Sequence, residues 1–342
     1  MMKNQTHPLT QLTSKDYQGG VSTLCTGCGH DSVTKHIIES FYKSGIHPFD
    51  VAKLSGIGCS SKTPAYFMSM SHGFNSIHGR MPSVATGAKS VNKNLKLIGI
   101  SGDGDTASIG IGSFLHLIRR NVPMIYIVEN NGVYGLTKGQ FSATADFESS
   151  QKSGEKNPFD SFDLCALALE AGCGFVARSF SGDGKQLVPL IAAAAKFNGT
   201  AFIDVISPCV TYANHSGSTK SYDYVKEHKL SLQELGYIDA KEENVADYEP
   251  GTTTKITLSD GSSLILKKLD TDHNTSSKTE AFRRLHQAKD NGEILTGLIY
   301  FDQSPASFVD RLGLPDIPLS HLTEKDLRPP EENLKSALKE FK

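Results

Sequence analysis

The sequence predicts an α/β protein built on a doubly wound, mostly parallel β-sheet. Between Cys25 and Asn214, apolar runs rich in β-branched residues alternate with longer segments of helical periodicity, a pattern typical of a parallel sheet covered on both faces. Each apolar run ends at or near a Gly, an Asn or a Ser-Pro pair, and these residues favour turns. Because ligands of such sheets bind at the carboxyl ends of the strands, the residues that follow each run are the candidate site.

The apolar runs predict strands, and the periodic segments between them predict helices. The expected strands are 51–55, 95–101, 123–129, 174–178 and 201–207, and the expected helices are 32–44, 106–120, 163–171 and 185–197. The last helix contains Ala192–Ala195, and alanine is the strongest helix former.

The chain beyond His215 is more polar and less regular. Residues 255–258 and 263–267 flank Asp260-Gly261 and predict a hairpin, and residues 330–341 predict a short helix. We expect three parts: an N-terminal arm over 1–20, the α/β domain over 21–220, and an irregular C-terminal extension over 221–342 that makes subunit contacts.

The composition excludes several classes of protein. The chain has 35 Lys and Arg against 37 Asp and Glu and a pI near 6.6, so we expect neither a nucleic-acid-binding surface nor a membrane anchor. The N-terminal residues lack the apolar core of a signal peptide, and no run of about 18 apolar residues occurs. We therefore expect a cytoplasmic protein whose six cysteines are free or bound to metal.

The segment Ser101–Asp105, Ser-Gly-Asp-Gly-Asp, joins a predicted strand to a predicted helix. Glycine-rich backbone in front of a helix presents free N–H groups to a phosphate. A magnesium ion that bridges a diphosphate also needs carboxylate or amide oxygens, and Asp103 supplies the first. About 25 residues later Asn130-Asn131 follows the next strand, so Asn131 supplies the second. Another Gly-Asp-Gly, Gly182–Gly184, is interpreted as a plain loop before a helix.

Four cysteines fall at the same predicted edge of the sheet. Cys25 and Cys28 form a Cys-x-x-Cys loop next to glycine, and Cys59 and Cys209 follow predicted strands. Four converging thiolates would suit either a [4Fe-4S] cluster or a tetrahedral zinc ion, and spacing alone does not choose between them. The remaining two, Cys165 and Cys173, lie in or beside an alanine-rich helix, where we expect buried, unreactive thiols.

Several motifs, taken in order, resemble the β subunits of 2-oxoacid:ferredoxin oxidoreductases. The matching segments are Cys25–His30, Gly56–Cys59, His78–Arg80, Gly102–Gly104 with Asn130-Asn131, Tyr134–Gln140 and Ser207–Cys209, over about residues 24–219. The resemblance implies the thiamine diphosphate-binding fold, with Mg²⁺ held by Asp103, Asn131 and the Val133 backbone. It also implies one [4Fe-4S] cluster, held by Cys25, Cys28, Cys59 and Cys209. The other expected cofactor contacts are Ile57, Gly58, Cys59, Ser60, His78, Gly102, Gly104, Asp105, Gly135 and Leu136.

The resemblance implies a reaction as well: oxidative decarboxylation of a 2-oxo acid, transfer of the acyl group to coenzyme A, and passage of electrons through the cluster to ferredoxin. Lys62 and Arg80 are candidates for binding a substrate carboxylate or a coenzyme A phosphate. Lys138 stands where pyruvate-using relatives tend to carry a small residue, and an extra cation suits a second carboxylate. Leu136–Gln140 therefore resembles the 2-oxoglutarate branch, with a pyruvate-using or broad-range enzyme as the alternative.

One part of the expected site is missing from the sequence. Thiamine enzymes use a glutamate on the aminopyrimidine ring, and no acidic residue of this chain can be assigned that role, nor can any other catalytic role be assigned. The resemblance implies a separate α subunit that carries the glutamate, in an α2β2 heterotetramer. Two other hypotheses stay open: a non-oxidative thiamine-dependent decarboxylase or synthase subunit without iron, and a zinc-binding interaction protein without thiamine diphosphate.

Overall fold

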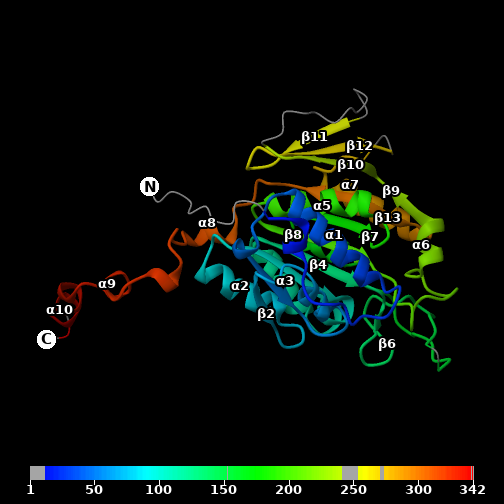
Figure 1. Cartoon of the computed structure of the whole chain (residues 1–342), viewed down its shortest axis with the longest axis horizontal. Helices are drawn as coiled ribbons and strands as arrows, with labels where there is room; N and C mark the ends of the chain where they lie inside the picture. The colour runs from blue at the N-terminus through cyan, green and yellow to red at the C-terminus, as the bar shows by residue number, and fades with distance from the viewer. Residues whose placement is uncertain (1–11, 152, 241–252, 270–272, 340, 342) are drawn as a thin grey trace.

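The computed structural model describes residues 12–151, 153–240, 253–269, 273–339 and 341, and its centre is an eight-stranded sheet (Figure 1). In spatial order the strands are β2 (His72–Asn75), β1 (Val51–Ser55), β3 (Lys96–Gly102), β4 (Met124–Asn130), β8 (Thr200–Ile206), β7 (Phe175–Phe180), β13 (Ile294–Phe301) and β9 (Lys229–Ser231). The first six run parallel to their neighbours, and β13 is antiparallel to β7. The predicted fold class is confirmed.

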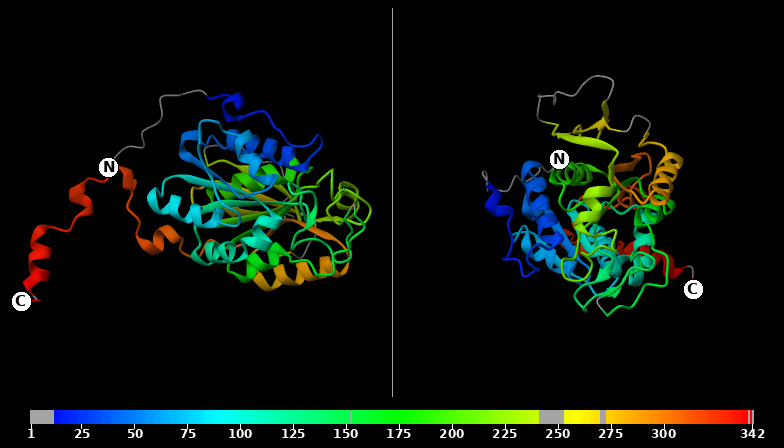
Figure 2. Two further views of the ribbon diagram at one scale, coloured as in Figure 1. Left: turned by 90° about the horizontal axis from the view of Figure 1, so that it is seen from below. Right: turned by 90° about the vertical axis from the view of Figure 1, so that its right-hand side faces the viewer.

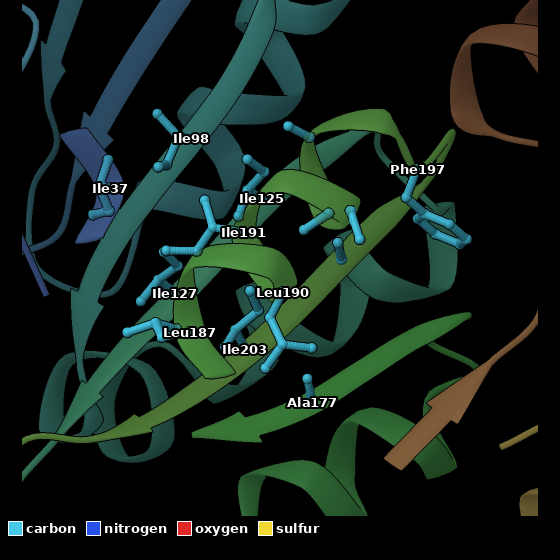
Figure 3. Packing of buried hydrophobic residues seen from close by; sticks show 14 of the residues in the cluster. Ile37, Ile98, Ile125, Ile127, Ala177, Leu187, Leu190, Ile191, Phe197 and Ile203 are labelled. Carbon is cyan, nitrogen blue, oxygen red and sulfur yellow. The ribbon is translucent and has the colours of Figure 1, made fainter. Parts of the chain in front are cut away.

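Helices cover both faces of this sheet. One face carries α1 (Gly29–Lys43) and α5 (Gly184–Lys196), and the other carries α2 (Met81–Val91), α3 (Ile111–Arg120), α4 (Leu164–Glu170) and α7 (Lys278–Asp290). Successive strand residues point to opposite faces, so Ile125 and Ile127 of β4 pack with α5 (Figure 3) while Tyr126 and Val128 pack on the other side. The alternation gives the sheet an apolar core on each face.

A second, smaller sheet packs on the outer side of α5 (Figure 1). Its antiparallel strands are β10 (Gln233–Ile238), β12 (Ser263–Lys268) and β11 (Thr253–Thr257). The predicted hairpin at Asp260-Gly261 is therefore confirmed, as β11 and β12.

The C-terminal part is less irregular than the sequence suggested. Strands β9 and β13 complete the main sheet, because β13 pairs antiparallel with β7, which lies far away in the chain, and parallel with β9. Beyond α8 (Phe308–Leu312), the helices α9 (Glu324–Leu327) and α10 (Glu331–Lys339) extend away from the body (Figures 1 and 2). The division into residues 1–20, 21–220 and 221–342 remains a prediction, and residues 1–11 lie outside the described part.

The connections between these strands and helices contain further short elements. They are η1 (Ser14–Tyr17), η2 (Pro48–Asp50), η3 (Ser60–Tyr66), the π-helical turn η4 (Gly104–Ile109), β5 (Val133–Tyr134), β6 (Gln140–Phe141), α6 (Tyr222–His228) and η5 (Leu319–His321). A π-helical turn at the start of a helix often marks a functional site. Within the described ranges, no helix combines the length and apolar character needed to cross a membrane.

Candidate active site

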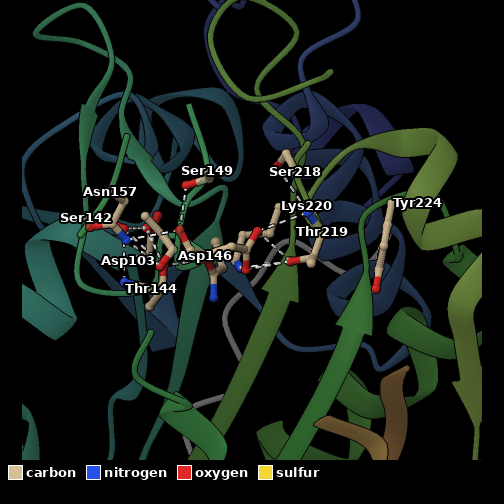
Figure 4. Close-up of polar contacts among 12 residues, drawn as sticks. Asp103, Ser142, Thr144, Asp146, Ser149, Asn157, Ser218, Thr219, Lys220 and Tyr224 are labelled. Atoms are coloured by element: carbon tan, nitrogen blue, oxygen red, sulfur yellow. Dashed lines mark hydrogen bonds and ion pairs between the residues drawn. The ribbon is translucent and has the colours of Figure 1, made fainter. Parts of the chain in front are cut away.

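Asp103 lies at the carboxyl end of β3, where the strand turns into η4, and its side chain is almost fully buried. The carboxylate accepts hydrogen bonds from Thr144 Oγ1 at 2.7 Å, from the backbone N–H of Asn131 at 3.2 Å, and from Ser142 Oγ (Figure 4). Burial raises the pKa of Asp103 above its ordinary value, although the hydrogen bonds oppose that shift. The carboxylate is thus held in one orientation at the sheet edge.

Asn131 follows β4, the strand next to β3, and therefore reaches the same point. Its backbone binds Asp103, and its side-chain oxygen accepts from the Val133 N–H at 3.1 Å. Asn130 serves a structural purpose instead, since its Nδ2 donates to Asp204 Oδ1 at 3.0 Å. The structure brings Asp103, Asn131 and Val133 together, as the sequence predicted.

The loop that supplies Ser142 and Thr144 is fixed by a second polar group (Figure 4). Asp146 accepts from Lys220 Nζ at 2.8 Å and from Thr219 Oγ1 at 2.8 Å. Burial opposes ionisation of Asp146, but the Lys220 ammonium and the hydrogen bonds hold its pKa below the ordinary value. This anchor positions the two hydroxyls that orient Asp103.

Asp105 holds the His78 loop against the end of β3. Its carboxylate accepts from the Gly79 N–H at 2.8 Å and from Ser101 Oγ at 2.7 Å, and it contacts His78 Nδ1. A methyl group on Gly56 would lie 2.0 Å from this carboxylate, so only glycine fits there. The segments around Gly56, His78 and Asp105 are thereby locked to one another.

These segments enclose a cavity of about 110 Å³ between the ends of β1, β3 and β4. It is lined by each of the twelve residues expected to contact the cofactor, namely Ile57, Gly58, Cys59, Ser60, His78, Gly102, Asp103, Gly104, Asp105, Asn131, Gly135 and Leu136. A methyl group on Gly104 would lie 2.5 Å from the Tyr134 ring. Among the described residues Ser60 Oγ finds no hydrogen-bond partner although it is buried, and a bound phosphate oxygen would satisfy it. Carboxylate, amide and hydroxyl groups around this cavity fit Mg²⁺ and a diphosphate.

The four predicted cysteine ligands lie around the same end of the sheet. Cys28 caps α1, and the Gly29 N–H donates to the Pro208 carbonyl at 3.2 Å, which joins the first cysteine loop to that of Cys209. A methyl group on Gly135 would lie 3.5 Å from the Cys59 sulfur and 3.7 Å from the Cys209 sulfur. Burial, with smaller contributions from Glu129, Cys209 and Cys59, raises the pKa of Cys28 to about 12. The thiols are near enough to repel one another as thiolates, and a cationic metal centre would relieve that repulsion.

The cysteines are neighbours without forming a closed ligand set. Across the described residues, no group of three or more His, Cys, Asp or Glu side chains is arranged closely enough to hold a metal ion. Cys25 is exposed and Cys28 is buried, so the two thiols of the Cys-x-x-Cys loop differ in their access to solvent. Cys165 and Cys173 are buried and contact the carbonyls of Ala177 and Thr200, as expected.

Glu129 and His30 also line the cavity, and the sequence reasoning gave neither a role there. Glu129 is fully buried and accepts from Thr63 Oγ1 at 3.0 Å, while His30 Nδ1 lies 2.6 Å from Ser207 Oγ. Burial raises the pKa of Glu129 well above its ordinary value and lowers the pKa of His30 to about 4. The sequence feature that could have pointed to Glu129 is a charged residue inside an otherwise apolar predicted strand.

The three candidate substrate-binding cations lie outside the lining of this cavity. Arg80 is exposed, and its NH1 group donates to Gly79 O at 3.2 Å and Ser113 Oγ at 3.3 Å. Lys62 is partly buried, and its charge favours the Cys59 thiolate. Lys138 is exposed and adopts a φ of +81°, a conformation that costs a non-glycine residue about 1–2 kcal/mol.

Comparison with known proteins agrees with this geometry. The family described as "Thiamine pyrophosphate enzyme, C-terminal TPP binding domain" matches residues 48–205. The 2-oxoacid:ferredoxin oxidoreductase subunit β of Saccharolobus solfataricus is 41% identical over 60% of this chain and 67% of its own length. The 2-oxoglutarate synthase subunit KorB of Methanocaldococcus jannaschii is 34% identical over 70% of this chain and 88% of its own length.

The chain belongs to the 2-oxoacid:ferredoxin oxidoreductase β subunits. The resemblance inferred from the motifs is thus confirmed, and apart from His30 the residues that line the cavity described above fall within the matched residues 48–205. A solved structure, a 2-oxoglutarate:ferredoxin oxidoreductase from Magnetococcus marinus with 2-oxoglutarate, coenzyme A and succinyl-CoA bound, has a TM-score of 0.71 and 29% identity. The match covers 90% of this β subunit and 93% of the matched chain, so it extends well beyond residues 48–205.

Proposed function

We propose that this chain is the β subunit of a 2-oxoglutarate:ferredoxin oxidoreductase, which converts 2-oxoglutarate and coenzyme A to succinyl-CoA and CO₂ and passes electrons through a [4Fe-4S] cluster to ferredoxin. The observation that carries the proposal is the position of the Cys59 and Cys209 sulfurs beside Gly135, a residue that also lines the cofactor cavity. One loop region would then serve both the diphosphate cofactor and the cluster.

The residues around the cavity have separate tasks in this proposal. Asp103, Asn131 and the Val133 carbonyl would hold Mg²⁺, and Ser60 Oγ and the N–H groups at the start of η4 would bind the diphosphate. Thiamine diphosphate supplies the carbanion chemistry when bound. Glu129 and His30 are buried in the lining of the cavity and would keep water away from it.

Lys138 supports the choice of 2-oxoglutarate over pyruvate. The residue keeps an unfavourable positive φ, and strain of this kind persists mainly where function requires it. Its ammonium would bind the second carboxylate of the substrate. A pyruvate-using or broad-range enzyme is the alternative proposal, and it gives Lys138 no such task.

The partner would complete the site. We propose that an α subunit contributes the aminopyrimidine glutamate in an α2β2 assembly, and that the C-terminal extension binds a neighbouring subunit in it. Helices α9 and α10 have no buried residues, and they expose Leu327, Leu334 and Leu338. Apolar side chains spaced along an extended arm fit a surface that becomes buried on assembly.

The substrate is tested with the complete enzyme, purified anaerobically with its α subunit. With coenzyme A present, 2-oxoglutarate should reduce a viologen dye, and Lys138→Gly should raise KM for 2-oxoglutarate roughly tenfold, as expected from losing a charged hydrogen bond. The same substitution should leave folding intact, because glycine relieves the positive φ. Activity with pyruvate alone would contradict the proposed substrate.

The cluster is tested separately by metal analysis and low-temperature EPR. Cys59→Ser should abolish the signal of the reduced [4Fe-4S] cluster while thiamine diphosphate and Mg²⁺ remain bound, because the cavity keeps its other ligands. Cys165→Ala is the matched control and should keep full iron content. A normal cluster signal in Cys59→Ser would overturn the ligand set, and wild-type protein with zinc or without iron would favour the zinc-binding or non-oxidative alternatives.

A further inference from the structure

A second cavity lies at the opposite edge of the main sheet, where β3 and β4 begin. Its volume is about 460 Å³, against about 110 Å³ for the cofactor cavity. Its walls are the end of α2, the start of β3 and β4, the end of α5 and the turn of the β11–β12 hairpin. The reaction proposed at the carboxyl edge of the sheet does not involve this cavity.

Four lysines line this cavity: Lys89, Lys93, Lys96 and Lys196. Among the described residues that line it, Asp260 is the only acidic side chain, so the wall carries a formal charge of +3. A wall with one dominant sign of charge concentrates ions of the opposite sign.

Two of these four lysines donate hydrogen bonds to uncharged acceptors. Lys89 Nζ donates to the Leu95 carbonyl at 2.6 Å, and Lys96 Nζ donates to the Ala195 carbonyl at 3.0 Å. Both acceptors are neutral. Lys196 pairs with Asp260 at 2.8 Å and lies 3.9 Å from Asp239.

The fourth lysine has a weak ionic partner. Lys93 reaches Asp316 at 2.6 Å, but Asp316 is 92% exposed. An ion pair that open to water is strongly screened and contributes little. The positive charge of Lys93 at the cavity is therefore only weakly compensated by Asp316.

The ammonium groups also repel one another. Burial, followed by repulsion from Lys96, lowers the pKa of Lys89 to about 8. Desolvation, followed by repulsion from Lys196, lowers the pKa of Lys96. The folded chain therefore holds three like charges in range of one another, at a cost in free energy that a multivalent anion would offset.

We propose that this cavity binds a small anion with two or more phosphate groups. Lysine ammonium groups are compact charges that suit phosphate oxygens, and no arginine that would favour a planar carboxylate lines the described wall. The volume falls in the range of small-molecule sites, roughly 300–1,000 Å³. Pro123, Met124 and Phe197 add apolar surface for an organic group joined to the phosphates.

The test is calorimetric titration of the complete enzyme with inorganic tripolyphosphate, added as its Mg²⁺ complex and corrected by the same titration into protein-free buffer. Thiamine diphosphate and Mg²⁺ are kept saturating so that the cofactor cavity is blocked. Saturable binding is expected, and Lys96→Gln should weaken it roughly tenfold, the effect of losing one charged hydrogen bond. Lys96 is the first residue of β3 and donates to a neutral carbonyl, and a glutamine amide can also donate a hydrogen bond, so this variant should fold normally.

Lys185→Gln is the control, because Lys185 is exposed near the other end of the same α5 helix that ends at Lys196, about 16 Å away at 1.5 Å per residue. It should leave the affinity unchanged. ATP that binds more tightly than tripolyphosphate would identify a nucleotide-like ligand, and equal affinities would identify the phosphates alone. Absence of binding at millimolar tripolyphosphate, or an affinity that Lys96→Gln does not alter, would overturn the proposal. Neither outcome touches the proposed reaction.

Discussion

The same tripeptide, Gly-Asp-Gly, occurs twice at the carboxyl ends of parallel strands, and of the two copies only Gly102–Gly104 lines the cavity proposed for the cofactor. Gly102–Gly104 follows β3 and begins η4, and Gly182–Gly184 follows β7 and begins α5. Both aspartates occupy the residue before the first helical turn. The two Gly-Asp-Gly segments therefore have the same local sequence and the same position at the end of a strand.

The two aspartates differ in the origin of their hydrogen-bond donors. Asp183 accepts from Gln186 N, three residues on in its own helix, and pairs with Lys229. Asp103 makes no such cap, and its donors come from Asn131, Ser142 and Thr144 on other segments. A carboxylate that caps its own helix stabilises the fold, whereas one held by converging loops is oriented for a ligand.

The largest expected effect follows from replacing the two aspartates in the same way. Asp103→Asn should weaken binding of thiamine diphosphate with Mg²⁺ by more than the roughly 10- to 100-fold that a change in an outer-shell residue costs, because a charged metal ligand is lost. Asp183→Asn should leave that affinity unchanged. Titration of cofactor-free protein checks both, and similar affinities in the two variants would contradict the distinction drawn here.

The comparison also indicates what the sequence could and could not predict. Asp103 and Asn131 were found because each follows an apolar strand, and parallel neighbouring strands end at the same edge. Ser142 and Thr144 lie in a loop, and no local pattern tells that their hydroxyls point back to Asp103. Their position depends on the Asp146–Lys220 pair, which joins residues 74 apart in the chain.

The strands and helices of the fold were likewise predicted where the local sequence pattern was clear and missed where it was not. Strands β1, β3, β4, β7 and β8 agree with the predicted runs within one or two residues, since each is rich in apolar residues and is bounded by turn-forming ones. Strand β13 was missed although Ile294–Phe301 is apolar, because it pairs antiparallel with a strand more than 100 residues earlier. Helix α2 was missed because Pro82 and Gly87 lower its local helical propensity.

An effect of intermediate size is expected from substituting the glycine that follows each aspartate, Gly104 or Gly184. A methyl group on Gly104 would lie 2.5 Å from the Tyr134 ring, and one on Gly184 would lie 2.5 Å from the His36 ring. Each Gly→Ala variant should lose about 1–3 kcal/mol of unfolding free energy, as overpacking usually costs. Only Gly104→Ala should also weaken cofactor binding, roughly tenfold, because Tyr134 lines the cavity and donates to the Gly104 carbonyl. Equal cofactor affinity in the two variants would show that Tyr134 can move without consequence.

The smallest expected effect concerns the capping function of Asp183. Asp183→Ala removes the hydrogen bond to Gln186 N and the ion pair with Lys229, and loss of a helix N-cap costs about 1 kcal/mol. Asp183→Asn keeps a capping oxygen and removes only the ion pair, which is partly exposed and is worth up to about 1 kcal/mol. Chemical denaturation should therefore rank wild type above Asp183→Asn and Asp183→Ala last, with cofactor affinity constant throughout. A fall in cofactor affinity in Asp183→Ala would mean that the second Gly-Asp-Gly also communicates with the site, because α5 packs against α1, whose N-terminus carries Cys28.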